Sequence, residues 1–311
     1  MIGRKKEIEL LNKYCEQDKS SLVAIYGRRR IGKTYFVRQM FKEHRTDCTF
    51  FEFTGEYKDD TKRQIKNFIE AIWEWFGIEP TKPIDDWTDA FNFLRRVLTD
   101  EMTIAPDKKI VLFFDEVPWV DRSTKAGYIS ALGHFWNTYC EKYNNFLVIL
   151  CGSNASWIKK KLLNENVGSF NNRIDYTIPM YPFDLKVTKE YLVNEKKMDI
   201  DDKSVLELYM VFGGVAKYLS YMDKDLDIDQ NITNVFFNIN GRLFNEYNEL
   251  FKSLFTNNDI KYKKIMDLLS SKKSGLNTSK IAKAIDMKMG ASIQNLLMTY
   301  ASVDLLNLYL H

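Results

Sequence analysis

The sequence has none of the long apolar segments that mark membrane and secreted proteins. No apolar run approaches the roughly 20 residues of a membrane helix. The N-terminus is charged between Arg4 and Glu7, where a signal peptide would be apolar. Low-complexity tracts and internal repeats are absent as well. We therefore expect a cytoplasmic protein with no membrane partner and, at 311 residues, a chain of two or three domains.

Cysteine and histidine are scarce, and neither is spaced as metal-ligand sets are. The chain has four cysteines and three histidines, without C-x-x-C spacing or a histidine cluster. Cys48 and Cys151 fall in predicted core strands, which favours reduced, buried thiols over disulfides. Charge of one sign is not in excess either, since 45 basic and 42 acidic residues give a net charge of +3. This balance excludes a chain-wide field that attracts polyanions.

The most informative segment that is present reads GRRRIGKT at residues 27–34, which fits G-x-x-x-x-G-K-[ST]. An apolar run at 22–26 precedes it and a helical pattern at 35–41 follows it, which is the context of a phosphate-binding loop. In such a loop, backbone N–H groups and the helix N-terminus bind phosphate oxygens. The lysine contacts the β- and γ-phosphates, and the hydroxyl binds Mg²⁺. The predicted nucleotide-binding residues of this loop are Gly27, Arg28, Arg29, Arg30, Ile31, Gly32, Lys33 and Thr34. For the three arginines, contact with a partner or with the lid is the alternative.

A second motif is the acidic pair Asp115-Glu116, which follows a continuous apolar run at 110–114. Such a run is typical of a strand buried on both faces. We predict that Asp115, together with Thr34, holds Mg²⁺ and that Glu116 is the general base for the attacking water. The alternative is a solvated acidic pair that ends a strand. Pro118 and Trp119, which come next, are expected to pack rather than to take part in the chemistry.

Further apolar segments complete a series of predicted strands, at 48–53, 146–151 and 173–178. Helical patterns separate them, and the alternation of strands with helices indicates an α/β fold of the doubly wound type. Nucleotides bind such folds at the carboxyl ends of the strands. Because no N-K-x-D guanine-binding motif is present, we expect ATP rather than GTP.

These motifs and several others together resemble one family. The chain opens with MIGRKKEIEL and continues through GRRRIGKT, FFDEVPW, ILCGSNASWI and FGGVAKYL. It resembles the prokaryotic AAA-type P-loop ATPases of the archaeal-ATPase family, a branch near the signal-transducing NTPases. The resemblance implies a five-stranded parallel sheet with strand order 5-1-4-3-2, followed by a helical lid and a winged-helix-like domain. The implied boundaries are 1–183 for the ATPase core, 184–258 for the lid, and 259–311 for a winged-helix-like domain with a truncated wing.

The resemblance also implies roles for residues outside the two motifs. Gly3 and Arg4 match the family's N-terminal box, which packs beside the adenine. Ser153 and Asn154 fall where the family carries its first sensor, a polar side chain near the γ-phosphate. The alternative for these two is an ordinary turn after a strand, since serine and asparagine both favour turns.

Arg173 precedes the last predicted strand, where AAA-type proteins place an arginine finger. If it acts on a neighbouring subunit, the protein is a homo-oligomer. The alternative is a surface residue that pairs with Asp175 or caps a preceding helix, a role that contributes little.

After residue 183 the pattern changes from strands to helices. Thr188 is predicted to begin a helix as its N-cap, and Gly213 and Gly214 are predicted to end another. The family's Gly-Gly-x-Pro lid motif is present except for its proline, which Ala216 replaces. The detailed geometry of the lid is therefore not implied.

The last segment, 259–311, combines three short helical patterns with an excess of lysine. Eight lysines oppose three aspartates between residues 259 and 288, which favours contacts with the phosphates of DNA. The third helix has no arginine for guanine edges, so sequence-specific recognition has weak support. Only 304–311 remain for a wing. A protein-interaction or purely structural role is the alternative.

Two classes of function follow from these observations. The first is Mg²⁺-dependent ATP binding and hydrolysis coupled to conformational change, acting on DNA or a protein partner. The second is a slow nucleotide-gated switch or scaffold whose output is a binding state. Steady-state turnover separates them, because roughly 1 s⁻¹ or more is the range of ordinary enzymes.

Overall fold

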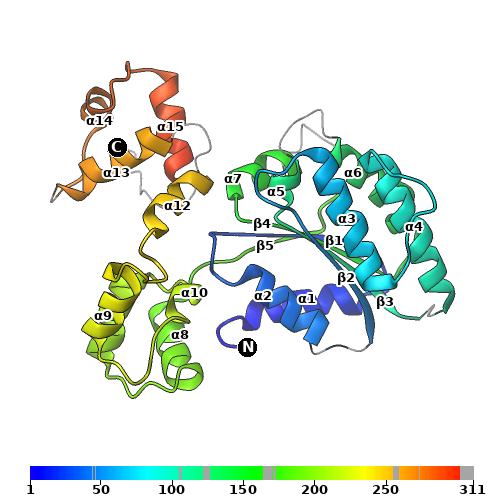
Figure 1. The fold of residues 1–311 in the computed structure, drawn as a ribbon, viewed down its shortest axis with the longest axis horizontal. Coiled ribbons are helices and arrows are strands. Elements are labelled where there is room, and N and C mark those ends of the chain that lie inside the picture. Colours follow the sequence, from blue (N-terminus) through cyan, green and yellow to red (C-terminus); the bar gives the residue numbers. More distant parts are fainter. Residues whose placement is uncertain are drawn as a thin grey trace. The chain divides into compact units, whose positions relative to one another are not determined.

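The computed structural model describes residues 1–43, 45, 47–104, 107–121, 127–163, 170, 173–254, 259–272 and 274–301. The chain divides into two compact units, Met1–Tyr181 and Pro182–His311 (Figure 1). The first unit holds the sheet, and the described part of the second is helical.

The first unit is built on a sheet that, within the described residues, has five parallel strands in the order β2-β3-β4-β1-β5. The strands are β1 (Ser21–Tyr26), β2 (Cys48–Thr54), β3 (Lys109–Asp115), β4 (Phe146–Gly152) and β5 (Tyr176–Pro179). This is the order predicted from the family resemblance, read from the opposite edge, so the predicted α/β fold is confirmed. β5 begins later than predicted because Arg173 lies in a turn, where its N–H donates to the carbonyl of Phe170 at 3.0 Å.

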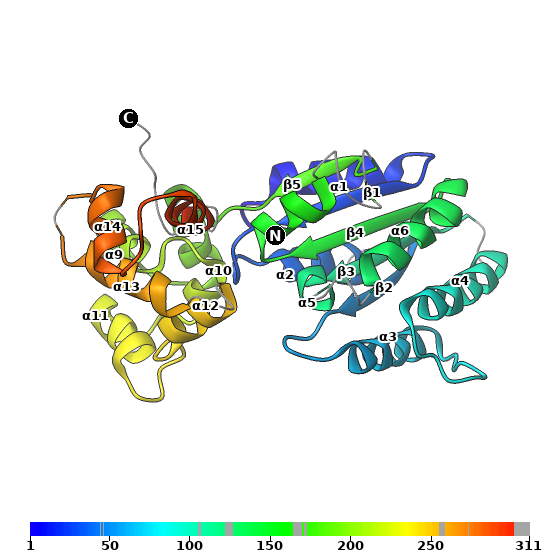
Figure 2. The same cartoon turned by 90° about the horizontal axis from the view of Figure 1, so that it is seen from above.

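Helices and short 3₁₀ or π-helical segments connect these strands and cover both faces of the sheet. They are α1 (Lys5–Glu16), α2 (Lys33–Arg38), η1 (Gln39–Glu43), α3 (Thr61–Phe76), α4 (Trp87–Ile104), α5 (Val117–Val120), α6 (Tyr128–Thr138), η2 (Cys140–Lys142), α7 (Ala155–Ile158) and η3 (Lys159–Leu163). Figures 1 and 2 both show α1 on the opposite side of the sheet from α3 and α4.

The strands β1 to β4 contribute side chains to two separate cores, because successive residues of a strand point to opposite faces. On β1, Leu22 and Ala24 join the core that α3, α4 and α6 cover. Val23 and Ile25 join the core that α1 and α2 cover. A strand with both faces buried must be apolar throughout, which explains the continuous apolar runs in the sequence.

The second unit contains two helical clusters. Its elements are α8 (Leu185–Glu190), η4 (Tyr191–Glu195), α9 (Asp202–Phe212), α10 (Ala216–Leu219), α11 (Ile228–Ile232), η5 (Thr233–Phe237), α12 (Glu246–Leu254), α13 (Asp259–Ser270), α14 (Thr278–Ala284) and α15 (Ala291–Ala301). The elements from α8 to η5 share one core, and those from α12 to α15 share another. The predicted wing at 304–311 lies outside the described residues.

One helix start in this unit differs from the prediction. α8 begins after Asp184, whose carboxylate accepts from the N–H of Val187 at 2.8 Å. Thr188, the predicted N-cap, is fully buried inside the helix. Aspartate is the better cap, and a buried position suits the methyl group of threonine. α9 ends at Gly213 as predicted, with a left-handed φ of 61°.

The thiols lie in the interior, as predicted. Cys15, Cys48, Cys140 and Cys151 are all buried and free of disulfide bonds. Burial raises the pKa of each thiol, in the case of Cys48 to about 11. Over the part of the chain that the structure describes, no helix combines the length and apolarity needed to cross a membrane.

The paired glycines after α9 provide a test of the packing in the second unit. Both have a left-handed φ, but a Cβ on Gly214 would overlap the carbonyl oxygen of Phe183, whereas a Cβ on Gly213 would meet open space. The N–H of Phe183 also donates to the carbonyl of Gly214 at 2.8 Å. We therefore expect Gly214→Ala to lower the free energy of unfolding by about 2–4 kcal/mol, because backbone must move.

The matched control is Gly213→Ala, which has only the conformational cost of about 1–2 kcal/mol for a left-handed residue. Urea unfolding followed by circular dichroism measures both. Equal losses for the two variants would contradict the close packing of Gly214 against Phe183.

Candidate nucleotide-binding site

The predicted site residues gather at the edge of the sheet where the parallel strands end. β1 ends at Tyr26, β3 at Asp115 and β4 at Gly152, so the loops that follow these strands meet at the same edge. These loops carry GRRRIGKT, the acidic pair, and Ser153 with Asn154. The structure thus brings together segments that lie far apart in the sequence.

The GRRRIGKT loop curves tightly around the side chain of Lys33. Gly27 has a φ of 157° and packs so closely on Met180 that a Cβ would overlap its carbonyl oxygen, and Gly32 has a φ of 95°. Lys33 is only 6% exposed. Its ammonium donates to the carbonyl oxygens of Gly27 at 2.9 Å and Arg28 at 3.0 Å. The loop therefore surrounds a positive charge, as an anion site requires.

Thr34 and Asp115 lie in direct contact. The Thr34 hydroxyl donates to Oδ2 of Asp115 at 2.5 Å, and the N–H of Glu116 donates to Oδ1 at 2.9 Å. Asp115 is only 2% exposed. Hydroxyl and carboxylate oxygens are the ligands that Mg²⁺ prefers, usually with waters and substrate phosphates completing its shell. The pair fits that ion, although no group of three or more His, Cys, Asp or Glu side chains able to hold a metal by itself occurs among the described residues.

Glu116 is held in a strained conformation at the start of α5. Its φ is 46°, which is uncommon for a residue with a side chain. The hydroxyl and the N–H of Ser153 donate to its Oε2 at 2.9 and 3.3 Å. Burial, and then the charge of Asp115, raise the pKa of Glu116, while Lys33 and the hydrogen bonds from Ser153 act in the opposite direction. Strain and a perturbed pKa often mark functional residues.

Ser153 and Asn154, which were predicted together as a sensor, have different contacts. Ser153 contacts Glu116, whereas the carboxamide oxygen of Asn154 accepts from the N–H of Trp157 at 2.9 Å and caps α7. Asn154 thus makes the capping contact that its residue type favours. Its predicted sensor role stays a prediction.

The N-terminal residues Gly3 and Arg4 adjoin the same loop. Gly3 has a left-handed φ of 68°. Arg4 is 6% exposed, and its guanidinium donates to the carbonyl of Ile31 at 3.0 Å and to Glu7 at 3.4 Å. Burial lowers the pKa of Arg4. The side chain of Arg4 thus stabilises the phosphate loop through the carbonyl of Ile31. The predicted contact of Gly3 and Arg4 with adenine stays a prediction.

One arginine of the loop and two aromatic residues near it form contacts that the sequence did not predict. The guanidinium of Arg29 lies 5.5 Å from the ring centroid of Trp119, which in turn contacts Tyr57 edge-on at 5.5 Å between centroids. Trp119 was expected only to pack. The sequence did offer one signal for a position near the site. Trp119 follows Glu116 by three residues, and that spacing places the two side chains one turn apart on a helix.

Arg173 lies at the opposite edge of the sheet. It precedes β5, and the neighbouring Asp175 bonds to Leu22 at the beginning of β1. Leu22 and Gly27 are separated by five residue steps of extended chain, or about 17 Å. The side chain of Arg173 therefore does not reach the phosphate loop of its own chain.

The contacts of Arg173 also differ from the predicted alternative. Its guanidinium bonds to the carboxamide of Asn137 and to Glu141, the latter at 3.3 Å, and its side chain is 37% exposed. Asp175, the predicted partner, instead pairs with Lys19 at 2.8 Å. Within the alternative reading, the Arg173–Asp175 pair was wrong because the two side chains turn toward different neighbours.

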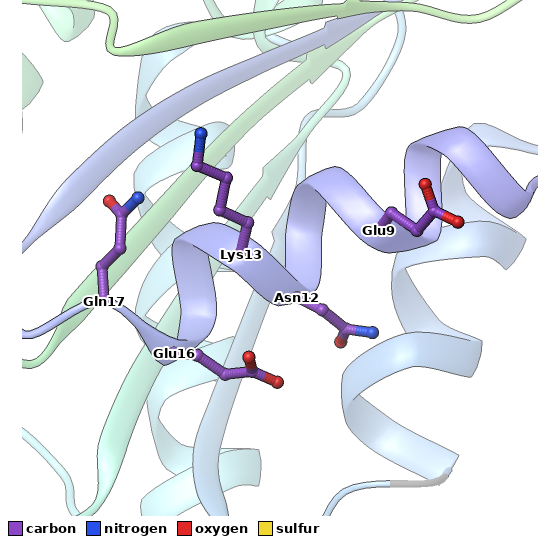
Figure 3. Close-up of a pocket in the computed structure, with 5 residues that line it drawn as sticks. All are labelled: Glu9, Asn12, Lys13, Glu16 and Gln17. Atoms are coloured by element: carbon purple, nitrogen blue, oxygen red, sulfur yellow. The ribbon is translucent and has the colours of Figure 1, made fainter.

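A shallow hollow lies along α1, lined by Glu9, Asn12, Lys13, Glu16 and Gln17 (Figure 3). The end of α1 lies close to the beginning of β3, because the ammonium of Lys109 donates to the carbonyl of Gln17 at 2.8 Å. The hollow therefore lies away from the edge that carries the candidate site.

Comparison with known sequences gives a consistent assignment. A family model described as an ATPase domain predominantly from Archaea matches residues 1–222. An uncharacterised protein of Methanocaldococcus jannaschii is 23% identical over 235 residues, which cover 72% of this chain and 46% of that protein. An uncharacterised ATP-binding protein of the same organism is 37% identical over 41 residues, which cover 13% of this chain and 70% of that protein. The chain thus spans about half the length of the first of these relatives.

Solved structures share the fold. The Walker-type ATPase of Pyrococcus abyssi superposes with a TM-score of 0.69 at 16% identity, covering 97% of this chain and 90% of that one. The ORC2 protein of Aeropyrum pernix, in complexes with ADPNP and ADP, gives a TM-score of 0.63 at 14% identity, covering 98% and 87%. With the family match over residues 1–222, and as the motifs predicted, the chain belongs to the family of ATPase domains found predominantly in Archaea.

Proposed function

We propose that this chain binds ATP with Mg²⁺ at the carboxyl edge of its sheet and hydrolyses it, and that turnover is coupled to conformational change. The observation that carries the proposal is the meeting of Lys33, the Thr34–Asp115 pair and the Glu116–Ser153 pair at one edge. A cation, an oxygen-ligand pair and a carboxylate base are the parts that phosphoryl transfer to water needs.

The chemistry of each group follows from its surroundings. The N–H groups of the loop and the ammonium of Lys33 bind phosphate oxygens and favour charge that develops on them. Mg²⁺, when bound by Thr34 and Asp115, neutralises charge on the phosphates. Glu116 accepts the proton of the attacking water, and Ser153 orients its carboxylate through the hydroxyl at 2.9 Å.

One observation favours the slower switch as a second candidate. Each charged group of the site bonds to a neutral group of the chain: Lys33 to loop carbonyls, Asp115 to the Thr34 hydroxyl, and Glu116 to the Ser153 hydroxyl. ATP and Mg²⁺ would compete with these contacts, which would slow turnover. A turnover well below about 1 s⁻¹ with nucleotide-dependent binding of a partner would favour the switch over an ordinary enzyme.

We also propose that residues 184–258 act as the lid and that 259–311 contact DNA or a protein partner. The exposed face of α15 carries Ser292, Gln294 and Asn295, opposite the buried Ile293 and Leu296. Polar side chains of this kind bond to phosphates and bases, and the lysines nearby add attraction for phosphate.

Glu116→Gln tests the general base. Glutamine keeps the shape and still accepts the hydrogen bonds from Ser153, but it does not take a proton. We expect turnover to fall by about 10²–10⁴-fold while ATP still binds. Glu56→Gln is the control, because Glu56 is an exposed acid near the same edge. Hydrolysis at the normal rate by Glu116→Gln would refute the assignment.

Lys33→Ala tests the phosphate site. Loss of a charge-assisted hydrogen bond worth about 1.5–3 kcal/mol weakens nucleotide affinity by one to two decades. Titration with a fluorescent ATP analogue measures this. Lys160→Ala, an exposed lysine of η3, serves as the control and is expected to bind normally. Equal dissociation constants for Lys33→Ala and the unmodified protein would mean that the loop is not the nucleotide site.

Arg173→Ala tests action in trans, the arrangement in which Arg173 serves the site of another subunit. A finger of this kind contributes about 10³–10⁵ in rate. We expect Arg173→Ala to stay folded and to bind ATP but to lose hydrolysis, and its mixture with Lys33→Ala to regain part of the activity.

Glu141→Gln is the matched control for Arg173→Ala. It removes the ion pair of Arg173 but leaves the guanidinium in place. We expect it to retain hydrolysis. An inactive mixture of the two other variants, together with activity per subunit that does not depend on protein concentration, would leave Arg173 as a surface residue.

A further inference from the structure

One indole ring joins three loops at the carboxyl edge of the sheet. Trp119 belongs to α5, after the acidic pair. The guanidinium of Arg29, in the phosphate loop, lies 5.5 Å from its ring centroid. Tyr57, between β2 and α3, meets the indole edge-on at 5.5 Å, and the ammonium of Lys58 lies 5.4 Å from the Tyr57 ring. Cations above rings and edge-to-face ring pairs are both attractive, so this stack holds the three loops together.

The tryptophan that carries this indole is bonded to Glu116 through the main chain. The backbone N–H of Trp119 donates to the carbonyl of Glu116 at 2.8 Å, in the single turn that forms α5. On the other side, the N–H of Gly55 donates to the carbonyl of Asp115 at 2.9 Å, and a Cβ on Gly55 would lie 2.8 Å from the Glu116 carbonyl. Glu116 is thus confined between α5 and the segment after β2. Its left-handed φ of 46° persists only because its neighbours hold it.

The stack begins beside the loop carbonyls that bond to Lys33. The ammonium of Lys33 bonds to the carbonyls of Gly27 and Arg28, the second of which adjoins Arg29. A phosphate that bonded to Lys33 would compete with these carbonyls. A change at the carbonyl of Arg28 would be passed to Arg29 through the peptide that links them.

We propose that Trp119 is a positioning residue that couples occupancy of the phosphate loop, through Arg29, to the alignment of Glu116. This inference rests on the proposed role of Glu116 as the general base. Trp119 touches neither ATP nor the attacking water. It sets the direction of the Glu116 carboxylate by fixing the turn from which that carboxylate projects.

Kinetics provide the first test, with one substitution on each side of the contact. Trp119→Leu removes the ring, and Arg29→Lys keeps the charge but loses the planar stack. For both we expect a roughly 5- to 30-fold lower kcat and a KM for ATP within about threefold of the unmodified value. Trp73→Phe is the matched control, because Trp73 is an exposed tryptophan of α3; it should leave both constants unchanged.

The double variant distinguishes coupling from two separate effects. If Arg29 acts through Trp119, the second substitution adds little to the first, and the two effects on kcat are not multiplicative. An unchanged kcat in either single variant would overturn the proposal. Multiplicative effects in the double variant would overturn it too.

Intrinsic fluorescence gives a readout that needs no hydrolysis. Addition of a Mg²⁺-bound, non-hydrolysable ATP analogue should change the tryptophan emission of the unmodified protein, and Trp119→Phe should lose most of that change while still binding the analogue. Trp73→Phe should keep it. A full response in Trp119→Phe would overturn the coupling.

The Glu116→Gln protein separates this inference from the proposed function on which it rests. It retains the stack and should respond to the analogue like the unmodified protein. Normal hydrolysis by Glu116→Gln would therefore refute the assignment of Glu116 as the general base. A fluorescence response that is lost in Trp119→Phe but kept in Glu116→Gln would support the coupling.

Discussion

The parallel direction of the strands is the constraint on which every part of the candidate site depends. Because β1, β3 and β4 run the same way, the loops after them meet at one edge. A single reversed strand would carry its loop to the other edge and separate the phosphate loop from the acidic pair. Arg173 illustrates this, because it precedes a strand and so lies at the edge where the strands begin. Its side chain is therefore too far from the phosphate loop of its own chain to contact a nucleotide there.

Burial then decides how the charges at that edge behave. Lys33 and Asp115 are almost fully removed from water, and an isolated buried charge costs several kcal/mol. The structure offsets this cost with hydrogen bonds inside the site, from Lys33 to carbonyl oxygens and from Thr34 to Asp115. In the function that we propose, a nucleotide and its Mg²⁺ would bond to the same groups. These contacts would then both keep the site folded and compete with its ligand.

The sequence was sufficient for the fold and for the main motifs because both depend on local patterns. Continuous apolar runs revealed the strands, and the glycine spacing of GRRRIGKT revealed the loop. The order of the strands followed from the family resemblance. Contacts between distant side chains could not be predicted in the same way. Ser153 and Asn154 are neighbours with similar chemistry, and only the path of the backbone directs one to Glu116 and the other to α7.

The same limit explains the remaining differences. Asp184 and Thr188 are both good helix caps, and Thr188 was excluded only because its position packs into a core. Arg173 and Asp175 are close in sequence but turn to different partners. The stack of Arg29 on Trp119 depends on two loops that are far apart in the chain. Each outcome is a matter of tertiary geometry, which residue types alone do not encode.

The close packing of Gly27 on Met180 has a consequence for how this protein can be divided. Met180 receives the backbone of the phosphate loop against its carbonyl oxygen, and its own N–H donates to the carbonyl of Tyr26 at 2.7 Å. The second unit begins two residues later, at Pro182. A fragment that stops before Met180 would lack the backbone against which Gly27 packs. A shortened ATPase core therefore has to keep the whole first unit, through Tyr181.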